Sequence, residues 1–205
     1  MIGVINTGVG NIPSICSALK KISCNFTICS SKGDLDRASK LILPGVGSFK
    51  AFYENIKKKD MFDEIINRVQ NGTPILGICL GFHALFESSS EFGNYSGFKF
   101  IKGNVQSIKD LDINERIPHV GWNNCEIKKD TEIFKEINNQ TNFYFTHSFT
   151  PVSVEKKDII STVVYGRELV VAVQNHNIVG VQFHPEKSQK QGLRLIKNFI
   201  ENFNA

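Results

Sequence analysis

Residues 1–86 alternate short apolar segments with longer amphipathic ones, and this alternation constrains the fold more than any other feature of the sequence. Ser48–Lys57 and Met61–Gln70 have the pattern of helices. Strands that alternate with helices form parallel sheets covered by helices on both faces. We therefore expect an α/β fold, namely a three-layer α/β/α sandwich with a largely parallel central sheet. Four apolar segments have the length and composition of its buried strands: Ile2–Asn6, Asn25–Cys29, Lys40–Leu43 and Pro74–Ile78.

The second half of the chain is richer in strand patterns and closes with a helix. Ser188–Phe203 carries apolar residues on one helical face. There is no linker, repeat or low-complexity stretch, so we expect a single domain over residues 1–205. Six segments alternate or run apolar as strands do: Asn104–Ile108, Asn123–Ile127, Asn142–His147, Ile159–Tyr165, Leu169–Asn175 and Ile178–Phe183.

Charge and apolar content exclude several classes of partner. The formal net charge is only +4, and the lysine runs at 57–59, 128–129 and 156–157 are short and scattered. This pattern is typical of a solvated surface rather than a nucleic-acid-binding stripe. No apolar run approaches the ~18 residues of a membrane span. We therefore expect neither nucleic acid nor membrane as a partner.

The cysteines and the N-terminus indicate the compartment. Five cysteines occur, an odd number, and none forms a Cys-x-x-Cys pair. This argues for a reducing compartment and against a disulfide framework or a metal site. Residues 1–8 show no basic leader before an apolar stretch, so we expect no signal peptide and a cytoplasmic location.

Gly77-Ile78-Cys79-Leu80-Gly81 lies between a predicted strand and a predicted helix and has the G-x-C-x-G form of a nucleophile elbow. Such a turn holds its central residue in a strained backbone conformation, and flanking glycines remove Cβ atoms that would collide. Cys79 would then lie at a helix N-terminus, which favours thiolate over thiol. The N–H of Leu80 would be one oxyanion donor. The alternative is that Cys79 is a small buried hydrophobe, as free cysteines usually are.

A thiolate nucleophile needs a general acid/base partner, and His184 is the candidate. It follows the apolar segment Val181–Phe183 and precedes Pro185 and Glu186. Residues two apart in an extended segment point the same way, so Glu186 can face His184. A carboxylate beside an imidazole fixes its tautomer and stabilises its charged form. The sequence thus predicts a Cys79-His184-Glu186 triad, against the alternative of a strand-end histidine with a surface partner.

Two glycine-rich turns near the predicted sheet edge have different interpretations. Pro44-Gly45-Val46-Gly47 follows a strand and is expected to bring a second backbone N–H to the oxyanion. A simple tight turn is the alternative. Gly8-Val9-Gly10-Asn11 lacks the third glycine of a dinucleotide fingerprint and the Gly-Lys-Ser/Thr of a P-loop, so we expect no cofactor.

Together these segments resemble the class I (triad) glutamine amidotransferases, and most closely the glutaminase subunits of imidazole glycerol phosphate synthase. The similarity covers essentially the whole chain and implies a flavodoxin-like α/β fold. The motifs that carry it are Gly8-Val9-Gly10-Asn11, Pro44-Gly45-Val46-Gly47, Gly77-Ile78-Cys79-Leu80-Gly81, Pro118-His119-Val120-Gly121-Trp122-Asn123, Tyr144-Phe145-Thr146-His147-Ser148 and Gln182-Phe183-His184-Pro185-Glu186-Lys187-Ser188.

The resemblance implies an enzyme that hydrolyses glutamine to glutamate and ammonia for histidine biosynthesis. It implies that Cys79 attacks glutamine, His184 moves the proton and Glu186 orients His184. A (β/α)8-barrel synthase subunit, forming a heterodimer with this chain, would receive the ammonia through a channel. The resemblance also implies oxyanion donors at Leu80, Val46 and Gly47, substrate contacts at Gly45, His83, Glu91, His147, Ser148 and Phe149, and an interface at Asn11, Trp122, Tyr144 and Lys187.

One departure from the family pattern leaves alternatives open. The family elbow usually continues Gly-Met-Gln, whereas this chain has Gly81-Phe82-His83. The replaced glutamine normally helps to hold the substrate amide, and histidine differs in reach and charge. A paralogous subunit feeding a sugar amidotransferase of surface-polysaccharide or flagellar-glycan synthesis is one alternative. A stand-alone hydrolase and a catalytically dead regulatory subunit are the others.

Overall fold

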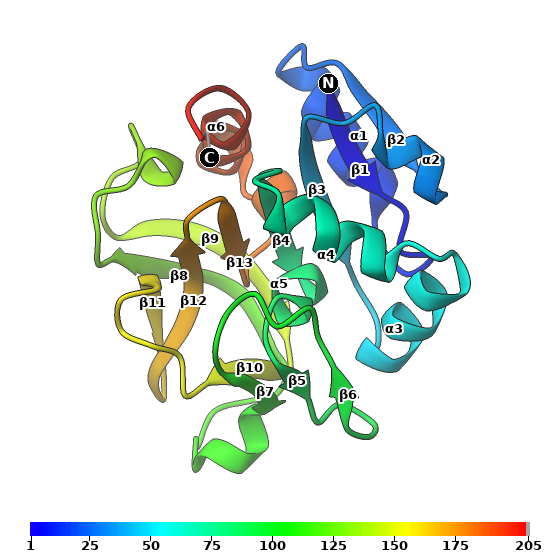
Figure 1. The fold of residues 1–205 in the computed structure, drawn as a ribbon. Helices are drawn as coiled ribbons and strands as arrows, with labels where there is room; N and C mark the ends of the chain where they lie inside the picture. Colours follow the sequence, from blue (N-terminus) through cyan, green and yellow to red (C-terminus); the bar gives the residue numbers. More distant parts are fainter. Residues whose placement is uncertain (204–205) are drawn as a thin grey trace.

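The computed structural model describes residues 1–203, which form a nine-stranded sheet with helices on both faces (Figure 1). The strand order is β2-β1-β3-β4-β13-β12-β11-β8-β9. The pairs from β2 to β13 are parallel, and those from β13 to β9 are antiparallel. The strands are β1 (Ile2–Ile5), β2 (Phe26–Cys29), β3 (Lys40–Gly45), β4 (Ile75–Cys79), β8 (His119–Ile127), β9 (Thr141–His147), β11 (Ile159–Tyr165), β12 (Arg167–Asn175) and β13 (Ile178–Val181).

The helices form the outer layers. Apolar residues of α1 (Ile12–Lys21) and α6 (Gln189–Glu201) pack into one hydrophobic cluster, and those of α3 (Phe49–Lys58) and α4 (Phe62–Gln70) pack into another. Figure 1 shows α3 and α4 on the near side of the parallel strands and α1 on the far side. The α/β/α layering predicted from the sequence is therefore confirmed. Short helices complete the chain: α2 (Lys32–Leu35), α5 (Leu80–Ala84), and the 3-10 turns at Ile108–Leu111, Glu132–Phe134 and Pro185–Lys187.

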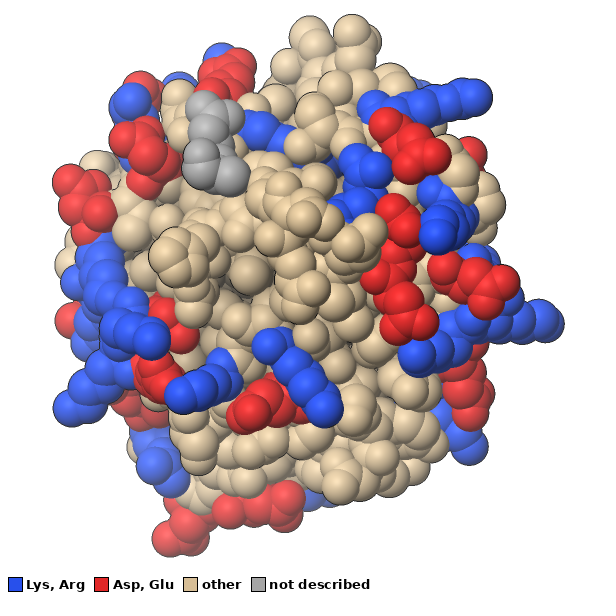
Figure 2. All heavy atoms as spheres, viewed as in Figure 1, with Lys and Arg blue, Asp and Glu red and all other residues tan. Residues whose placement is uncertain are grey.

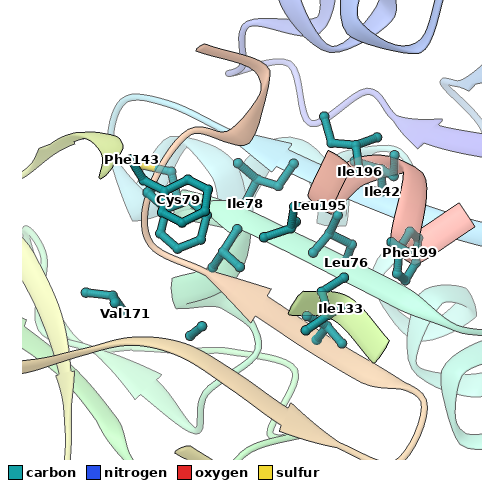
Figure 3. Packing of buried hydrophobic residues seen from close by; sticks show 14 of the residues in the cluster. Ile42, Leu76, Ile78, Cys79, Ile133, Phe143, Val171, Leu195, Ile196 and Phe199 are labelled. Atoms are coloured by element: carbon teal, nitrogen blue, oxygen red, sulfur yellow. The ribbon is translucent and has the colours of Figure 1, made fainter. Parts of the chain in front are cut away.

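The parallel strands are buried on both faces because alternate residues enter the two clusters. In β3, Ile42 packs with the α1/α6 side while Leu41 and Leu43 pack with the α3/α4 side. Such strands have near-continuous apolar sequences, which is why these segments were recognisable. Figure 3 shows the α1/α6-side cluster, in which Leu76, Ile78 and Cys79 follow one another along β4. Cys79 thus lies where the apolar core ends at the carboxyl edge of the sheet.

A second, four-stranded sheet was not anticipated from the sequence. Its order is β10-β7-β5-β6, and only β7 (Asn104–Ser107) lies in a segment predicted as a strand. The others are β5 (Ser88–Ser89), β6 (Tyr95–Ser96) and β10 (Phe149–Val152). The two-residue strands β5 and β6 are too short to leave a hydrophobic periodicity to detect. Within this sheet, β5 and β6 flank Glu91, and β10 begins two residues after His147.

The surface agrees with the sequence-based expectations on charge. On the face shown in Figure 2, Lys and Arg side chains are interspersed with Asp and Glu around a largely uncharged centre. Several form exposed ion pairs, such as Lys128 with Glu126 and Glu168. Within residues 1–203, no helix is long and apolar enough to cross a membrane.

Candidate active site

Cys79 lies at the junction between β4 and α5, in a backbone conformation that non-glycine residues rarely adopt. Its φ is 54° and its ψ is −106°. The expected strain at this residue is thereby confirmed, since positive φ is costly for a residue with a Cβ. The residue is 7% exposed and borders a cavity at the sheet edge. Helix α5 is only five residues long, so its dipole supports the thiolate less than that of a longer helix would.

Gly81 permits the close approach of the elbow to the neighbouring strand. A Cβ on Gly81 would lie 1.8 Å from the backbone oxygen of Leu43 in β3, a distance that no local adjustment relieves. A Cβ on Gly77 would lie 2.6 Å from the carbonyl oxygen of Gly81. The glycines of the G-x-C-x-G pattern are therefore required by backbone packing.

Substitution of Gly81 by alanine should destabilise the fold by at least about 3 kcal/mol, because α5 and β3 must separate to admit the methyl group. Chemical denaturation monitored by circular dichroism measures this. Gly33→Ala is the matched control, since a Cβ on Gly33 meets nothing within 4 Å. The control should keep wild-type stability or gain a few tenths of a kcal/mol. Equal stabilities of the two variants would contradict the packing described for Gly81.

His184 and Glu186 lie together at the carboxyl end of β13. Nδ1 of His184 is 2.8 Å from Oε1 of Glu186, and both side chains are almost completely buried. The backbone N–H of His184 donates to the carbonyl of Tyr144 in β9, and the Ser188 hydroxyl donates to the His184 carbonyl. These contacts fix the ring so that its other nitrogen is free to act on a neighbour.

The His184 ring is held in its charged form by its surroundings. Burial disfavours the charge, but contacts with Cys79 and Glu186 outweigh it, and the pKa of His184 is raised well above its ordinary value. Nε2 is buried and makes no conventional hydrogen bond within residues 1–203, so it remains available toward the thiol. An imidazolium between a carboxylate and a thiol favours a thiolate–imidazolium pair.

The cavity beside Cys79 has a volume of about 310 Å³ and polar groups converge on it. This volume lies at the small end of ordinary ligand pockets. Oε2 of Glu91 accepts the N–H of Phe49 at 2.8 Å, and burial raises the pKa of Glu91 although this hydrogen bond opposes the shift. Residues 1–203 contain no group of three His, Cys, Asp or Glu side chains placed to hold a metal ion. The lining residues are Val46, Gly47, Cys79, Leu80, His83, Glu91, Pro118, Thr146, His147, Ser148 and Phe149.

Two histidines form a buried hydrogen-bonded chain behind this cavity. Nδ1–H of His147 donates to the Phe149 carbonyl at 2.8 Å, and Nε2 of His147 lies 2.8 Å from Nδ1 of His119, whose Nε2 contacts Oδ1 of Asn123 at 2.9 Å. Burial lowers the pKa of His147 to about 3, so the ring is neutral. His119 is stacked between Phe145 and Tyr165. The pair therefore fixes the cavity wall formed by the end of β9.

Comparison with known proteins decides the family of this site. The family model described as glutamine amidotransferase class-I matches residues 3–203. The chain belongs to this family. Amidotransferase activity that uses glutamine is the property that defines these enzymes.

Several relatives of the amidotransferase are similar over nearly their whole length. Imidazole glycerol phosphate synthase subunit HisH 1 of Campylobacter jejuni is 40% identical over 201 residues, which cover 98% of this chain and 99% of the relative. Subunit HisH of Methanocaldococcus jannaschii is also 40% identical over 201 residues, with the same coverage.

Solved structures of lower identity support the fold. A chain described as a glutamine amidotransferase matches with a TM-score of 0.77 at 19% identity, covering 98% of this chain and 97% of that chain. A chain of PurLQS from Thermotoga maritima matches with a TM-score of 0.77 at 18% identity, covering 97% and 96%. The predicted amidotransferase fold is confirmed by these likenesses.

The structure brings most of the predicted site residues of the amidotransferase together, but three of the predicted catalytic and substrate-binding residues do not line the cavity. Gly45 does not line the cavity; it faces Leu80, whose Cβ would lie 2.8 Å from a Cβ on Gly45. The side chains of His184 and Glu186 are buried and do not line the cavity either. A substrate would therefore meet Cys79 first, with His184 behind it.

The four residues predicted at the partner interface lie away from the cavity. Trp122 is 45% exposed on β8 and packs against Tyr144 with 5.8 Å between ring centroids. Nζ of Lys187 lies 5.5 Å from the centre of the Tyr144 ring. These three therefore form one surface cluster. Asn11 caps α1 through its side-chain oxygen, which accepts the N–H of Ser14.

Gln182 was not among the site residues predicted from the sequence. Its carboxamide is fully buried, with Oε1 2.7 Å from Nε2 of His83 and Nε2 4.0 Å from Sγ of Cys79. The only sequence signal was a polar residue inside an apolar strand, two positions before His184. Thr146 was also missed, and its carbonyl lies 4.0 Å from Sγ of Cys79.

Proposed function

We propose that the chain hydrolyses glutamine to glutamate and ammonia and supplies the ammonia to the synthase subunit of an imidazole glycerol phosphate synthase. The observation that carries the proposal is the buried Cys79-His184-Glu186 arrangement at the elbow beside a cavity of about 310 Å³. Full-length relatives named as subunits of imidazole glycerol phosphate synthase support this pathway over a sugar-amidating one.

In the proposed first step, the Cys79 thiolate attacks the carboxamide carbon of glutamine. The new C–S bond displaces the carbonyl π electrons onto oxygen. Leu80 N–H and a backbone N–H of Val46 or Gly47 would stabilise that oxyanion, since Leu80, Val46 and Gly47 all border the cavity. When the carbonyl re-forms, the C–N bond breaks and the proton on Nε2 of His184 goes to the departing nitrogen, which leaves as ammonia.

The second step releases glutamate from the γ-glutamyl thioester. His184, now neutral, accepts a proton from water as the water oxygen attacks the thioester carbon. The C–S bond breaks, and the thiolate–imidazolium pair is restored. Glu186 holds the ring through Nδ1 throughout and stabilises its charge, as the 2.8 Å contact supports.

Substrate recognition would use the far wall of the cavity. One oxygen of the Glu91 carboxylate accepts a hydrogen bond from Phe49 N–H. The other oxygen would accept a hydrogen bond from the ammonium group of glutamine in the cavity. His83, His147, Ser148 and Phe149 also line the cavity, where they would contact the rest of the substrate. A carboxylate opposite an ammonium favours amino acids over simple amides.

The partner is proposed to be a (β/α)8-barrel synthase subunit that docks on the cluster of Trp122, Tyr144 and Lys187, near Asn11. This cluster is well placed to transmit docking to the triad. The carbonyl of Tyr144 accepts the backbone N–H of His184, and the N–H of Tyr144 donates to the Ser188 hydroxyl. The heterodimer and the cytoplasmic location belong to this proposal.

The partner proposal is tested by measuring glutamate release with and without a cyclase subunit and its nucleotide ligand. We expect the complex to hydrolyse glutamine about 100-fold faster, the loss expected when a single oxyanion donor is misplaced in the free chain. Trp122→Ala should reduce the stimulation, whereas Val164→Ala, an exposed apolar residue on β11, should leave it unchanged. A rate that the cyclase subunit does not change would indicate a stand-alone hydrolase.

A further inference from the structure

The carboxamide of Gln182 lies between the triad nucleophile Cys79 and His83, a buried histidine that the triad mechanism leaves out. Gln182 follows β13 directly and is completely buried, beside the buried His83 of α5. Its oxygen lies 2.7 Å from Nε2 of His83, and its nitrogen lies 4.0 Å from Sγ of Cys79. The side chain is therefore held between the histidine that replaces the usual elbow glutamine and the reacting sulfur.

The protonation of His83 determines which way this carboxamide points. Burial lowers the pKa of His83 to about 4, although hydrogen bonds to Gln182 and to the Phe149 backbone oppose the shift, so the ring is neutral and carries one N–H. Oε1 of Gln182 is the atom that lies 2.7 Å from Nε2 of His83, and because a carbonyl oxygen only accepts hydrogen bonds, this orientation requires the N–H on Nε2. With the oxygen held there, the NH₂ group must face Cys79.

The orientation of the carboxamide matters because of what else surrounds the sulfur. The Thr146 carbonyl lies 4.0 Å from Sγ and favours the protonated thiol. The Gln182 NH₂ group, at the same distance, presents a donor that favours the thiolate. A rotated carboxamide would instead direct a second oxygen at the sulfur and would leave Nε2–H of His83 without an acceptor.

We propose that Gln182 stabilises the Cys79 thiolate directly, and that His83 is a positioning residue that holds the Gln182 NH₂ group toward Sγ. The inference rests on the proposed function, because it assigns these residues to the same nucleophile. It gives His83 a role that does not require contact with glutamine. His83, which differs from the family pattern, thereby remains a polar partner for the buried carboxamide of Gln182.

The test is the rate at which iodoacetamide alkylates Cys79 in the free chain, measured from about pH 5 to pH 9 by mass spectrometry of the Cys79 peptide. We expect Gln182→Leu to slow alkylation about fivefold at neutral pH and to move the profile to higher pH. Gln174→Leu, the same exchange on the neighbouring strand β12, should keep the wild-type profile.

A second pair of variants tests the role of His83. His83→Leu removes the donor and should slow alkylation toward the Gln182→Leu value. His83→Gln keeps an N–H donor and should restore much of the wild-type rate. Identical profiles for wild type and Gln182→Leu would overturn the proposal; should Gln182→Leu not fold, identical profiles for His83→Leu and His83→Gln would do so. Alkylation of Cys79 requires neither glutamine nor a partner subunit. A lack of glutaminase activity would therefore contradict the proposed function but would leave the outcome of this alkylation test unaffected.

Discussion

Replacement of Cys79 by alanine is expected to lower glutamine hydrolysis by at least about 10⁴-fold, to the level of residual binding and oxyanion effects. The residue carries the nucleophile and lies in a strained turn at the cavity wall, where no other cysteine can replace it. The four other cysteines lie elsewhere and are all free thiols. The measurement is glutamate release by the partner-stimulated enzyme, because its higher rate gives the largest measurable range of rate decrease.

Cys24→Ser is the matched control for this loss. Cys24 is half-buried just after α1 and does not border the cavity, so its substitution should leave the rate within about twofold of wild type. The thermal unfolding midpoint shows whether the Cys79→Ala variant keeps its fold. Substantial hydrolysis by a folded Cys79→Ala variant would remove the nucleophile assignment.

His184→Ala should lower the rate by about 10⁴-fold, whereas Glu186→Gln should lower it by only about 10- to 100-fold. The difference follows from the hydrogen bond. The carboxamide introduced by Glu186→Gln would still present a carbonyl oxygen to Nδ1–H of His184, but it would no longer supply the charge that helps to raise the pKa of His184.

The two variants also differ in pH dependence. His184 must be protonated to release ammonia, so activity is lost as pH rises through the raised pKa of His184. Without the Glu186 charge that pKa falls, and the alkaline limb of the rate profile should move to lower pH. His176→Ala, in the exposed turn between β12 and β13, should not change the profile. An unshifted alkaline limb in Glu186→Gln would show that Glu186 does not set the charge of His184.

The parallel half of the fold was predictable because burial on both faces makes its strands apolar throughout. The elbow was predictable for a related reason: the backbone of Gly81 lies against the carbonyl of Leu43, so only glycine is tolerated there. Local sequence therefore specified the strain at Cys79. The pairing of His184 with Glu186 was likewise accessible, because the two residues are only two positions apart.

Other parts of the site depend on contacts that local sequence does not encode. Gln182 gains its significance from His83 and Cys79, which lie 99 and 103 positions earlier in the chain. Glu91 was expected at the substrate only through resemblance, and its hydrogen bond to Phe49 N–H depends on the unanticipated sheet that contains β5 and β6. The antiparallel strands β8, β9, β11 and β12 had recognisable patterns, but their pairing order required the structure.

The most direct test of the proposed mechanism is to trap its covalent intermediate. Wild-type chain is mixed with glutamine, quenched in acid within a turnover, digested and analysed by mass spectrometry. The mechanism predicts one γ-glutamyl group on the Cys79 peptide, absent from Cys79→Ala and retained longer in His184→Ala once it forms. Steady glutamine hydrolysis with no acyl group on Cys79, or with the group on another residue, would contradict it.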